Sequence, residues 1–369
     1  MRLPTRKALR LDGDEVYDVY QTENYMNICR VERAMPYKTL TSRQHVYQDP
    51  LHLSATMPYL ADSLFTYIPS DSIPFYLQSY IRGKTPMSTW PTVMSMTVTY
   101  LLVVLGTREI MKDRAPFKLT TLFRAHNLFL SVFSFILVVL LGEEVFSTWM
   151  KLGSYRILCA EEAFTPRIEF YLVMAYLIRY YEFIDTVFLA LRKKPLTFLH
   201  VYHHSATAVL SFVQLNGRAT VCWVAALLNL GIHAIMYYYY FATAGGARFW
   251  WKKHLTTLQI IQFIIILATA AFAGWNLVAY NWLPMVPHFG NCAGQLSTGL
   301  IGAAVIASYL LLFVDFFYRT YLKKAQAKVS HSTTTRAKMD GVSSGSLLLR
   351  VDTSKVFNAV EALILMTST

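Results

Sequence analysis

Long apolar runs dominate the pattern of hydrophobic and polar positions along the chain. A helix needs about 20 apolar residues to cross a bilayer. Seven runs approach that length: 90–107, 126–142, 168–191, 197–215, 219–242, 255–280 and 297–318. Pro195 and three histidines interrupt the fourth run, so six spans are the alternative. The pattern predicts an all-α, polytopic membrane protein with about seven transmembrane helices forming a bundle.

The segments on either side of these runs have a different composition. Residues 1–88 are mixed and polar, and no apolar segment follows the basic residues near the start, so we expect no cleavable signal peptide. After Lys324 the chain is rich in Ser, Thr and Lys, which is typical of disorder. We divide the chain into an N-terminal region without a readable function (1–88), a membrane domain (89–322) and a tail (323–369).

Composition and charge agree with a membrane location. Hydrophobic residues make up 54% of the 369 residues and charged residues only 15%, whereas soluble domains have about 25% charged residues. The net charge of +12 would suggest nucleic-acid binding in a soluble protein, but here Lys and Arg collect in the odd-numbered loops, and no nucleic acid is expected. The positive-inside rule then places those loops and the C-terminus in the cytosol, with the N-terminus lumenal or external.

Two cysteines fall in loops predicted on the same side of the membrane. Cys159 lies in the second loop and Cys292 in the sixth, both on the predicted lumenal side. An oxidising lumen permits a disulfide between them. Two independent thiols are the alternative.

Charged residues occur inside the third predicted span, where burial in lipid is costly. Arg179, Glu182 and Asp185 are spaced by three residues, so they share one helix face. Such a stripe indicates a functional site facing the interior of the bundle. A salt-bridged cluster near the membrane surface is the alternative.

Histidines are concentrated at the start of the fourth predicted span. His200, His203 and His204 lie within five residues, and their spacing directs the three imidazoles toward one cavity. Imidazole can bind a metal, transfer protons or act as a nucleophile. The cluster therefore predicts a functional site without deciding its chemistry.

Polar residues on the fifth and sixth spans follow a similar spacing. Asn229 and His233 lie one turn apart on the fifth span, and Tyr237 continues their face. Gln259 and Gln262 lie one turn apart on the sixth. An aromatic belt for Tyr237 and interhelical hydrogen bonds for the glutamines are the alternatives. Together these spans predict one polar chamber near their cytosolic ends.

Several functions fit such a chamber. A membrane diiron desaturase or hydroxylase would need several histidine clusters, and the ten histidines of the chain form only one. A single metal held by His200, His204 and His233 is a further alternative. A seven-span receptor or transporter would leave the histidines without a role.

Four ordered motifs carry a resemblance to a known family. They are RYYEFIDT at 179–186, HVYHH at 200–204, NLGIHAIMYYYY at 229–240 and TTLQIIQ at 256–262. They resemble KxxExxDT, HxxHH, NxxxHxxMYxYY and TxxQxxQ of the ELO family of very-long-chain fatty acid elongases, over about residues 70–325. Arg179 stands where the family has lysine, which keeps the charge but not an easily deprotonated amine. The segment 308–324 is most similar to the fungal-type branch.

The resemblance implies a 3-oxoacyl-CoA synthase that condenses a long-chain acyl-CoA with malonyl-CoA and releases CO₂ and CoA. It implies His203 as the nucleophile that carries the acyl group, with His233 as its partner. The other implied catalytic residues are His200, His204, Asn229, Glu182 and Asp185, and the implied substrate-binding residues are Arg179, Gln259, Gln262 and Tyr237. No metal or organic cofactor is needed in this scheme.

The resemblance also implies a setting in the endoplasmic reticulum membrane, among membrane lipid. Lys193, Lys194, Lys252 and Lys253, at the predicted cytosolic mouth, are candidates for binding CoA phosphates; a role in topology alone is the alternative. The acyl chain is expected in an apolar tunnel toward the lumenal side. The product would pass to a ketoacyl reductase, a dehydratase and an enoyl reductase, in very-long-chain synthesis for sphingolipids. A homodimer is compatible with the sequence.

Overall fold

The computed structural model describes residues 6–11, 15–22, 25–30, 60–67 and 72–323, in two compact units, Met1–Gln48 and Asp49–Thr369. The first unit contains an antiparallel sheet of three strands in the order β1-β2-β3: β1 (Arg6–Leu11), β2 (Glu15–Thr22) and β3 (Tyr25–Arg30). The apolar-run analysis does not predict these strands. Their sequences are too short and polar to register as spans, although β2 contains two Val and two Tyr residues, which favour strands.

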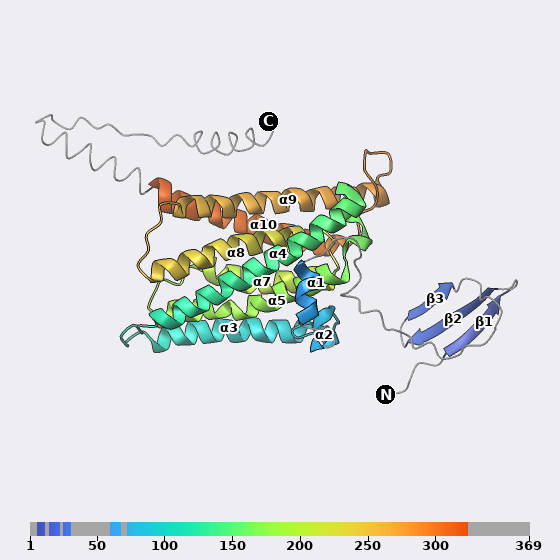
Figure 1. The fold of residues 1–369 in the computed structure, drawn as a ribbon. Coiled ribbons are helices and arrows are strands. Elements are labelled where there is room, and N and C mark those ends of the chain that lie inside the picture. The colour runs from blue at the N-terminus through green and yellow to red at the C-terminus, as the bar shows by residue number, and fades with distance from the viewer. Residues whose placement is uncertain (1–5, 12–14, 23–24, 31–59, 68–71, 324–369) are drawn as a thin grey trace, which may run out of the picture. The chain divides into compact units, whose positions relative to one another are not determined.

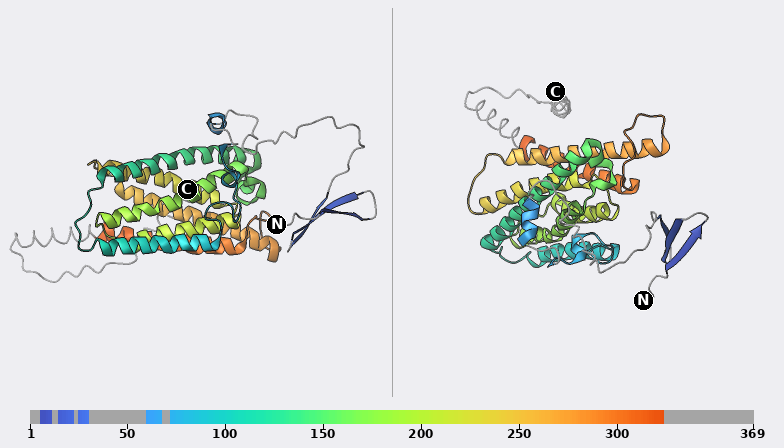
Figure 2. Two further views of the ribbon diagram at one scale, coloured as in Figure 1. Left: turned by 90° about the horizontal axis from the view of Figure 1, so that it is seen from below. Right: turned by 45° about the vertical axis from the view of Figure 1, so that its right-hand side comes forward.

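The second unit is helical in its described part. Its helices are α1 (Leu60–Tyr67), α2 (Phe75–Gln78), α3 (Trp90–Ile110), α4 (Thr120–Cys159), α5 (Pro166–Tyr181), α6 (Phe183–Leu191), α7 (Phe198–Asn216), α8 (Cys222–Ala244), α9 (Lys252–Trp282) and α10 (Leu296–Phe317). A short 3₁₀ turn, Glu161–Ala163, precedes α5, and a π-helical turn, Tyr318–Leu322, follows α10. The long helices run side by side along one axis (Figure 1), as a second view confirms (Figure 2).

Six of the described helices close into a ring. Helix α4 packs on α5 and α8, α9 packs on α8 and α10, and α7 connects α10 back to α5. Helix α3 lies outside this ring, against α6 and α7. The ring encloses the space in which the polar residues of α5, α7, α8 and α9 meet.

The predicted membrane bundle is confirmed, and the protein is a multi-pass membrane protein. Five of the described helices, α3, α4, α8, α9 and α10 with its π-helical extension, are long and apolar enough to cross a bilayer. The two other predicted spans correspond to α5 with α6, and to α7. A total of seven spans stays a prediction.

Two predicted spans differ in extent from the helices. The run 168–191 is divided at Glu182 into α5 and α6, and the Glu182 side chain is engaged in the interior. The run 126–142 is the middle of the 40-residue α4, which continues through the predicted second loop and is interrupted at Gly153, where φ is 79°. Glycine has no Cβ and adopts this left-handed conformation without strain.

Acidic residues at one end of the bundle hold the segment before α3. The Glu143 carboxylate accepts hydrogen bonds from the backbone N–H groups of Leu60 (2.7 Å) and Ala61 (3.2 Å), at the start of α1. Glu169 accepts from the Tyr80 backbone N–H at 2.9 Å. Residues 60–67 and 72–88 therefore contact the membrane domain, although the sequence groups them with the N-terminal region.

A disulfide joins Cys159, the last residue of α4, to Cys292 in the segment before α10. The backbone N–H of Ala293 also donates to the Cys159 carbonyl at 2.8 Å. The sequence leaves open whether the two thiols pair, and the structure pairs them. Cys222 is a buried thiol of the described region.

We expect removal of this disulfide to destabilise the membrane domain. The bond closes a loop with a sequence separation of 133 residues, and cross-links over long loops contribute about 2–4 kcal/mol. Replacing Cys159 and Cys292 together by Ser should lower the midpoint of thermal unfolding in detergent. Adding a reductant should lower the unfolding midpoint of the wild type but not that of the double variant. An unchanged midpoint would show that the bond contributes nothing to stability.

Candidate active site

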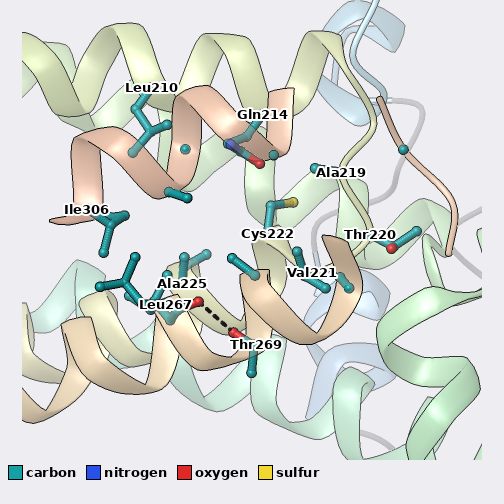
Figure 3. Close-up of a pocket in the computed structure, with 18 of the residues that line it drawn as sticks. Leu210, Gln214, Ala219, Thr220, Val221, Cys222, Ala225, Leu267, Thr269 and Ile306 are labelled. Atoms are coloured by element: carbon teal, nitrogen blue, oxygen red, sulfur yellow. Dashed lines mark hydrogen bonds between the residues drawn. The ribbon is translucent and has the colours of Figure 1, made fainter. Parts of the chain in front are cut away.

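A cavity of about 670 Å³ lies inside the ring, between α5, α7, α8, α9 and α10. Its lining is polar at one end, where Arg179, His203, Asn229 and Gln262 meet. From there it extends past apolar side chains to the segment that contains Cys292. Figure 3 shows part of this lining: Leu210, Val221, Cys222, Ala225, Leu267 and Ile306 surround the space. The site thus combines a polar end with a long apolar extension.

The histidine cluster begins α7. Thr197 caps the helix by accepting a hydrogen bond from the His200 backbone N–H at 3.3 Å, just after Pro195. Of the three histidines, only His203 lines the cavity. The rings of His200 and His204 contact each other, with centroids 4.4 Å apart. The three imidazoles are therefore close together, but only that of His203 lines the cavity.

Tyr309 of α10 adjoins the histidine that lines the cavity. The centroids of the His203 and Tyr309 rings are 4.8 Å apart, and the Tyr309 hydroxyl donates to the His203 carbonyl at 3.3 Å. The same hydroxyl is 3.0 Å from Oγ1 of Thr207. These contacts hold the polar end of α7 against α10. The motifs do not include Tyr309, so sequence reasoning misses it.

A buried charge cluster joins α5 to α8. Nη1 of Arg179 donates to both carboxylate oxygens of Glu182, at 3.0 and 3.1 Å. Nδ1 of His233 lies 3.0 Å from Oε1 of Glu182 and 3.2 Å from Nη1 of Arg179. All three residues are at most 4% exposed. A protonated Nδ1 donates to Glu182 and leaves Nε2 of a neutral ring as an acceptor.

This charge cluster reaches the polar end of the cavity through Arg179. The side chains of Arg179 and His203 both line that cavity. The structure therefore brings the predicted residues of three motifs together at one end of the cavity. It places Arg179 both in the ion pair and in the cavity lining.

A second buried network involves Asp185 but not the cavity. Nε2 of His126 on α4 is 2.6 Å from Oδ1 of Asp185, and the hydroxyl of Tyr237 donates to Oδ2 at 2.7 Å. None of these three residues lines the cavity. The hydroxyl of Tyr237 is engaged with a carboxylate outside the cavity lining, and its role in substrate binding stays a prediction. The sequence gives no sign of this pairing, because Asp185 lies 59 residues after His126.

Two amides of the cavity have an acceptor atom without a partner. Oδ1 of Asn229 and Oε1 of Gln262 are buried and make no hydrogen bond among the described residues. An unsatisfied buried acceptor costs about 1–3 kcal/mol, so both positions favour a ligand that supplies donors. Gln259, by contrast, does not line the cavity and donates to Sδ of Met236 at 3.7 Å.

The four predicted lysines lie on the surface, away from the cavity lining. Nζ of Lys193 donates to the Lys112 carbonyl at 2.8 Å, and Nζ of Lys253 lies 5.5 Å from the centroid of the Phe317 ring. Lys194 and Lys252 are exposed. Their binding of phosphate stays a prediction. Within the described ranges, no three His, Cys, Asp or Glu side chains are grouped so as to hold a metal ion.

Comparison with known proteins places this geometry in a family. Residues 85–329 match the GNS1/SUR4 (ELO) family. The chain belongs to the ELO family. The matched region contains all four motifs and all the residues that line the cavity.

Named relatives of this ELO protein are fatty acid elongases. "Putative fatty acid elongase 1" of Schizosaccharomyces pombe is 42% identical over 258 residues, which is 70% of this chain and 77% of the relative. "Putative fatty acid elongase 2" of the same organism is 39% identical over 76% of this chain and 75% of the relative. "Fatty acid elongase A" of Dictyostelium discoideum is 36% identical over 66% and 88%, respectively.

We expect Tyr237→Phe to destabilise this ELO protein, because the substitution removes the hydroxyl that donates to buried Asp185. Leaving a buried carboxylate oxygen unsatisfied should cost about 1–3 kcal/mol of unfolding free energy. The matched control is Tyr238→Phe, since Tyr238 is 49% exposed and should change stability little. Thermal unfolding of both variants in detergent measures the difference. Equal midpoints would contradict a structural role for this hydroxyl.

Proposed function

We propose that the protein is a fatty acid elongase of the 3-oxoacyl-CoA synthase type, which condenses a long-chain acyl-CoA with malonyl-CoA. The observation that carries the proposal is the position of His203 at the polar end of an apolar cavity. A fatty acyl chain fits the apolar part, and its thioester then lies at the imidazole. The names of the relatives support the same activity.

The first step transfers the acyl group to the enzyme. A ring nitrogen of His203 attacks the thioester carbonyl, the C–S bond breaks, and the imidazole proton goes to the CoA thiolate. The resulting acyl-imidazole divides one difficult condensation into two easier steps. The cysteines of the cavity do not compete for this role: Cys292 is in a disulfide, and Cys222 lies about 10 Å along α8 from Asn229.

The second step extends the chain by two carbons. Malonyl-CoA loses CO₂, its enolate carbon attacks the acyl carbonyl, and the bond to His203 breaks. The imidazole takes up one proton, so the overall reaction consumes one. Arg179 lines the cavity and supplies a fixed positive charge for the malonyl carboxylate and then the enolate oxygen. Glu182 holds both Arg179 and His233 in place, and His233 acts as the partner of His203.

The surroundings of the reaction follow from the same proposal. CoA would remain in the cytosol, with its phosphates near the surface lysines, and the acyl chain would extend toward the lumenal side. The enzyme would reside in the endoplasmic reticulum membrane without a metal or organic cofactor. Its 3-oxoacyl product would go to a ketoacyl reductase, a dehydratase and an enoyl reductase, in very-long-chain synthesis for sphingolipids.

Replacing His203 by Ala should abolish condensation, with a loss of more than about 10³-fold, as expected when a covalent nucleophile is removed. Incorporation of labelled malonyl-CoA into acyl-CoA by microsomes measures the activity. Mass spectrometry of the purified protein after incubation with acyl-CoA alone should show an acyl adduct in the wild type only. The control is His254→Ala, because His254 is exposed and outside the cavity. An active His203→Ala enzyme would disprove the assignment.

Substitutions of Arg179 should show whether the reaction needs a positive charge at this position. Arg179→Lys keeps the cation and should retain activity to within about tenfold, whereas Arg179→Met should lose more than about 10²-fold of kcat. The control, Arg319→Met, removes an exposed ion pair with Asp315. Melting points show whether each variant is folded. Full activity of folded Arg179→Met would contradict a catalytic charge at this position.

A further inference from the structure

The cavity is not enclosed along its whole length. At the end away from His203, its lining includes side chains on the outer surface of the ring: Trp275 on α9 is 51% exposed and Leu300 on α10 is 62% exposed. Ala271 and Gly299 line the cavity and are exposed as well. The same residues thus face the inside of the cavity and the surroundings of the bundle.

Two glycines in this region adjoin open space. A Cβ atom built on Gly274 of α9 or on Gly299 of α10 would meet no atom of the described residues within 4 Å. Gly302, one turn further along α10, is different, because a Cβ there would come within 2.5 Å of Nε2 of Gln214. The residues that line the cavity and also reach the outer surface here form what we call the lateral window: Ala271, Gly274 and Trp275 on α9, and Gly299 and Leu300 on α10.

The window is continuous with the site of chemistry. Gln262, whose buried Oε1 has no partner among the described residues, and Tyr309, which contacts His203, line the same cavity. From Gln262 to Gly274, and from Tyr309 to Gly299, the helices rise by about 15–18 Å at 1.5 Å per residue. An extended chain advances about 3.5 Å over three bonds, so an acyl tail of about 14 carbons reaches the window.

We propose that the end of a long acyl chain leaves the cavity through this lateral window and enters the hydrocarbon of the bilayer. The inference rests on the proposed function, because its occupant is the acyl substrate. The apolar side chains on both sides of the gap, Trp275 and Leu300, fit a methylene chain. The window lies within α9 and α10, both apolar enough to span a membrane. Chain length is then not limited by the volume of the cavity.

The first test uses the wild-type protein in microsomes or proteoliposomes. The substrates are a long acyl-CoA and the same acyl-CoA with a bulky aromatic group at its terminal carbon. The tail of both is longer than the distance to the window. Elongation of the modified substrate at a rate within about tenfold of the plain one supports an open window. Elongation of the plain substrate alone would overturn the inference and leave the proposed function intact.

The second test fills the gap. The variants are Gly274→Leu and Gly299→Leu, at positions where a Cβ atom meets no described atom within 4 Å. Each should lower elongation of the long acyl-CoA by about tenfold relative to one whose tail ends before the window, and should abolish elongation of the modified substrate. The matched control is Gly106→Leu on α3, where a Cβ also meets nothing within 4 Å and which is outside the cavity.

The outcomes distinguish the two proposals. Equal ratios of long to short activity in the window variants and the Gly106→Leu control would contradict the window. No two-carbon-longer product from any acyl-CoA, plain or modified, would contradict the proposed function and remove the occupant of the window. Melting points of the three glycine variants in detergent identify any variant that fails to fold.

Discussion

A buried ion pair between Arg179 and Glu182 is the interaction on which the site depends. Charges are costly in the interior of a membrane bundle unless they are paired and hydrogen-bonded, and here both oxygens of Glu182 receive the guanidinium while one also contacts His233. The contacts of this pair with His233 connect the end of α5 to α8. It therefore positions a cation and an imidazole beside the histidine of the cavity, in a region with little water, where their charges act most strongly.

Much of this arrangement was predictable from the sequence, because apolar runs, polar spacing and ordered motifs are local signals. They locate the helical bundle, and they predict that Arg179, His203, Asn229 and Gln262 meet in one chamber. Spacing also places Glu182 and Asp185 on one helix face. It cannot show that they belong to different networks, since that depends on which helix each side chain contacts. The engagement of Tyr237 and His126 with Asp185 is decided by packing between α4, α6 and α8.

Other features depend on long-range contacts that leave no mark in a single sequence. One predicted span is divided at Glu182, a residue that pairs with His233 of a distant helix. The extension of α4 to Cys159 crosses a polar stretch that reads as a loop, but Glu143 and Glu144 are held there by α1 and by Thr165. The lateral window is a property of two helices together. Gly274 and Gly299 are ordinary small residues of apolar runs until the structure shows open space beside both.

The disulfide has a consequence for how the ring can deform. In the order of packing, α4 neighbours α5 and α8, whereas α10 neighbours α7 and α9. The disulfide between Cys159 and Cys292, together with the hydrogen bond from Ala293 to Cys159, therefore connects opposite sides of the ring. The disulfide links these sides covalently at the end of the bundle remote from His203. Because this link restricts separation of the helices at one end of the bundle, the helices can move apart more easily at the other end. Any widening of the bundle is thereby directed to the end where the histidines lie, which is the end that the proposed acyl-CoA substrate would have to enter.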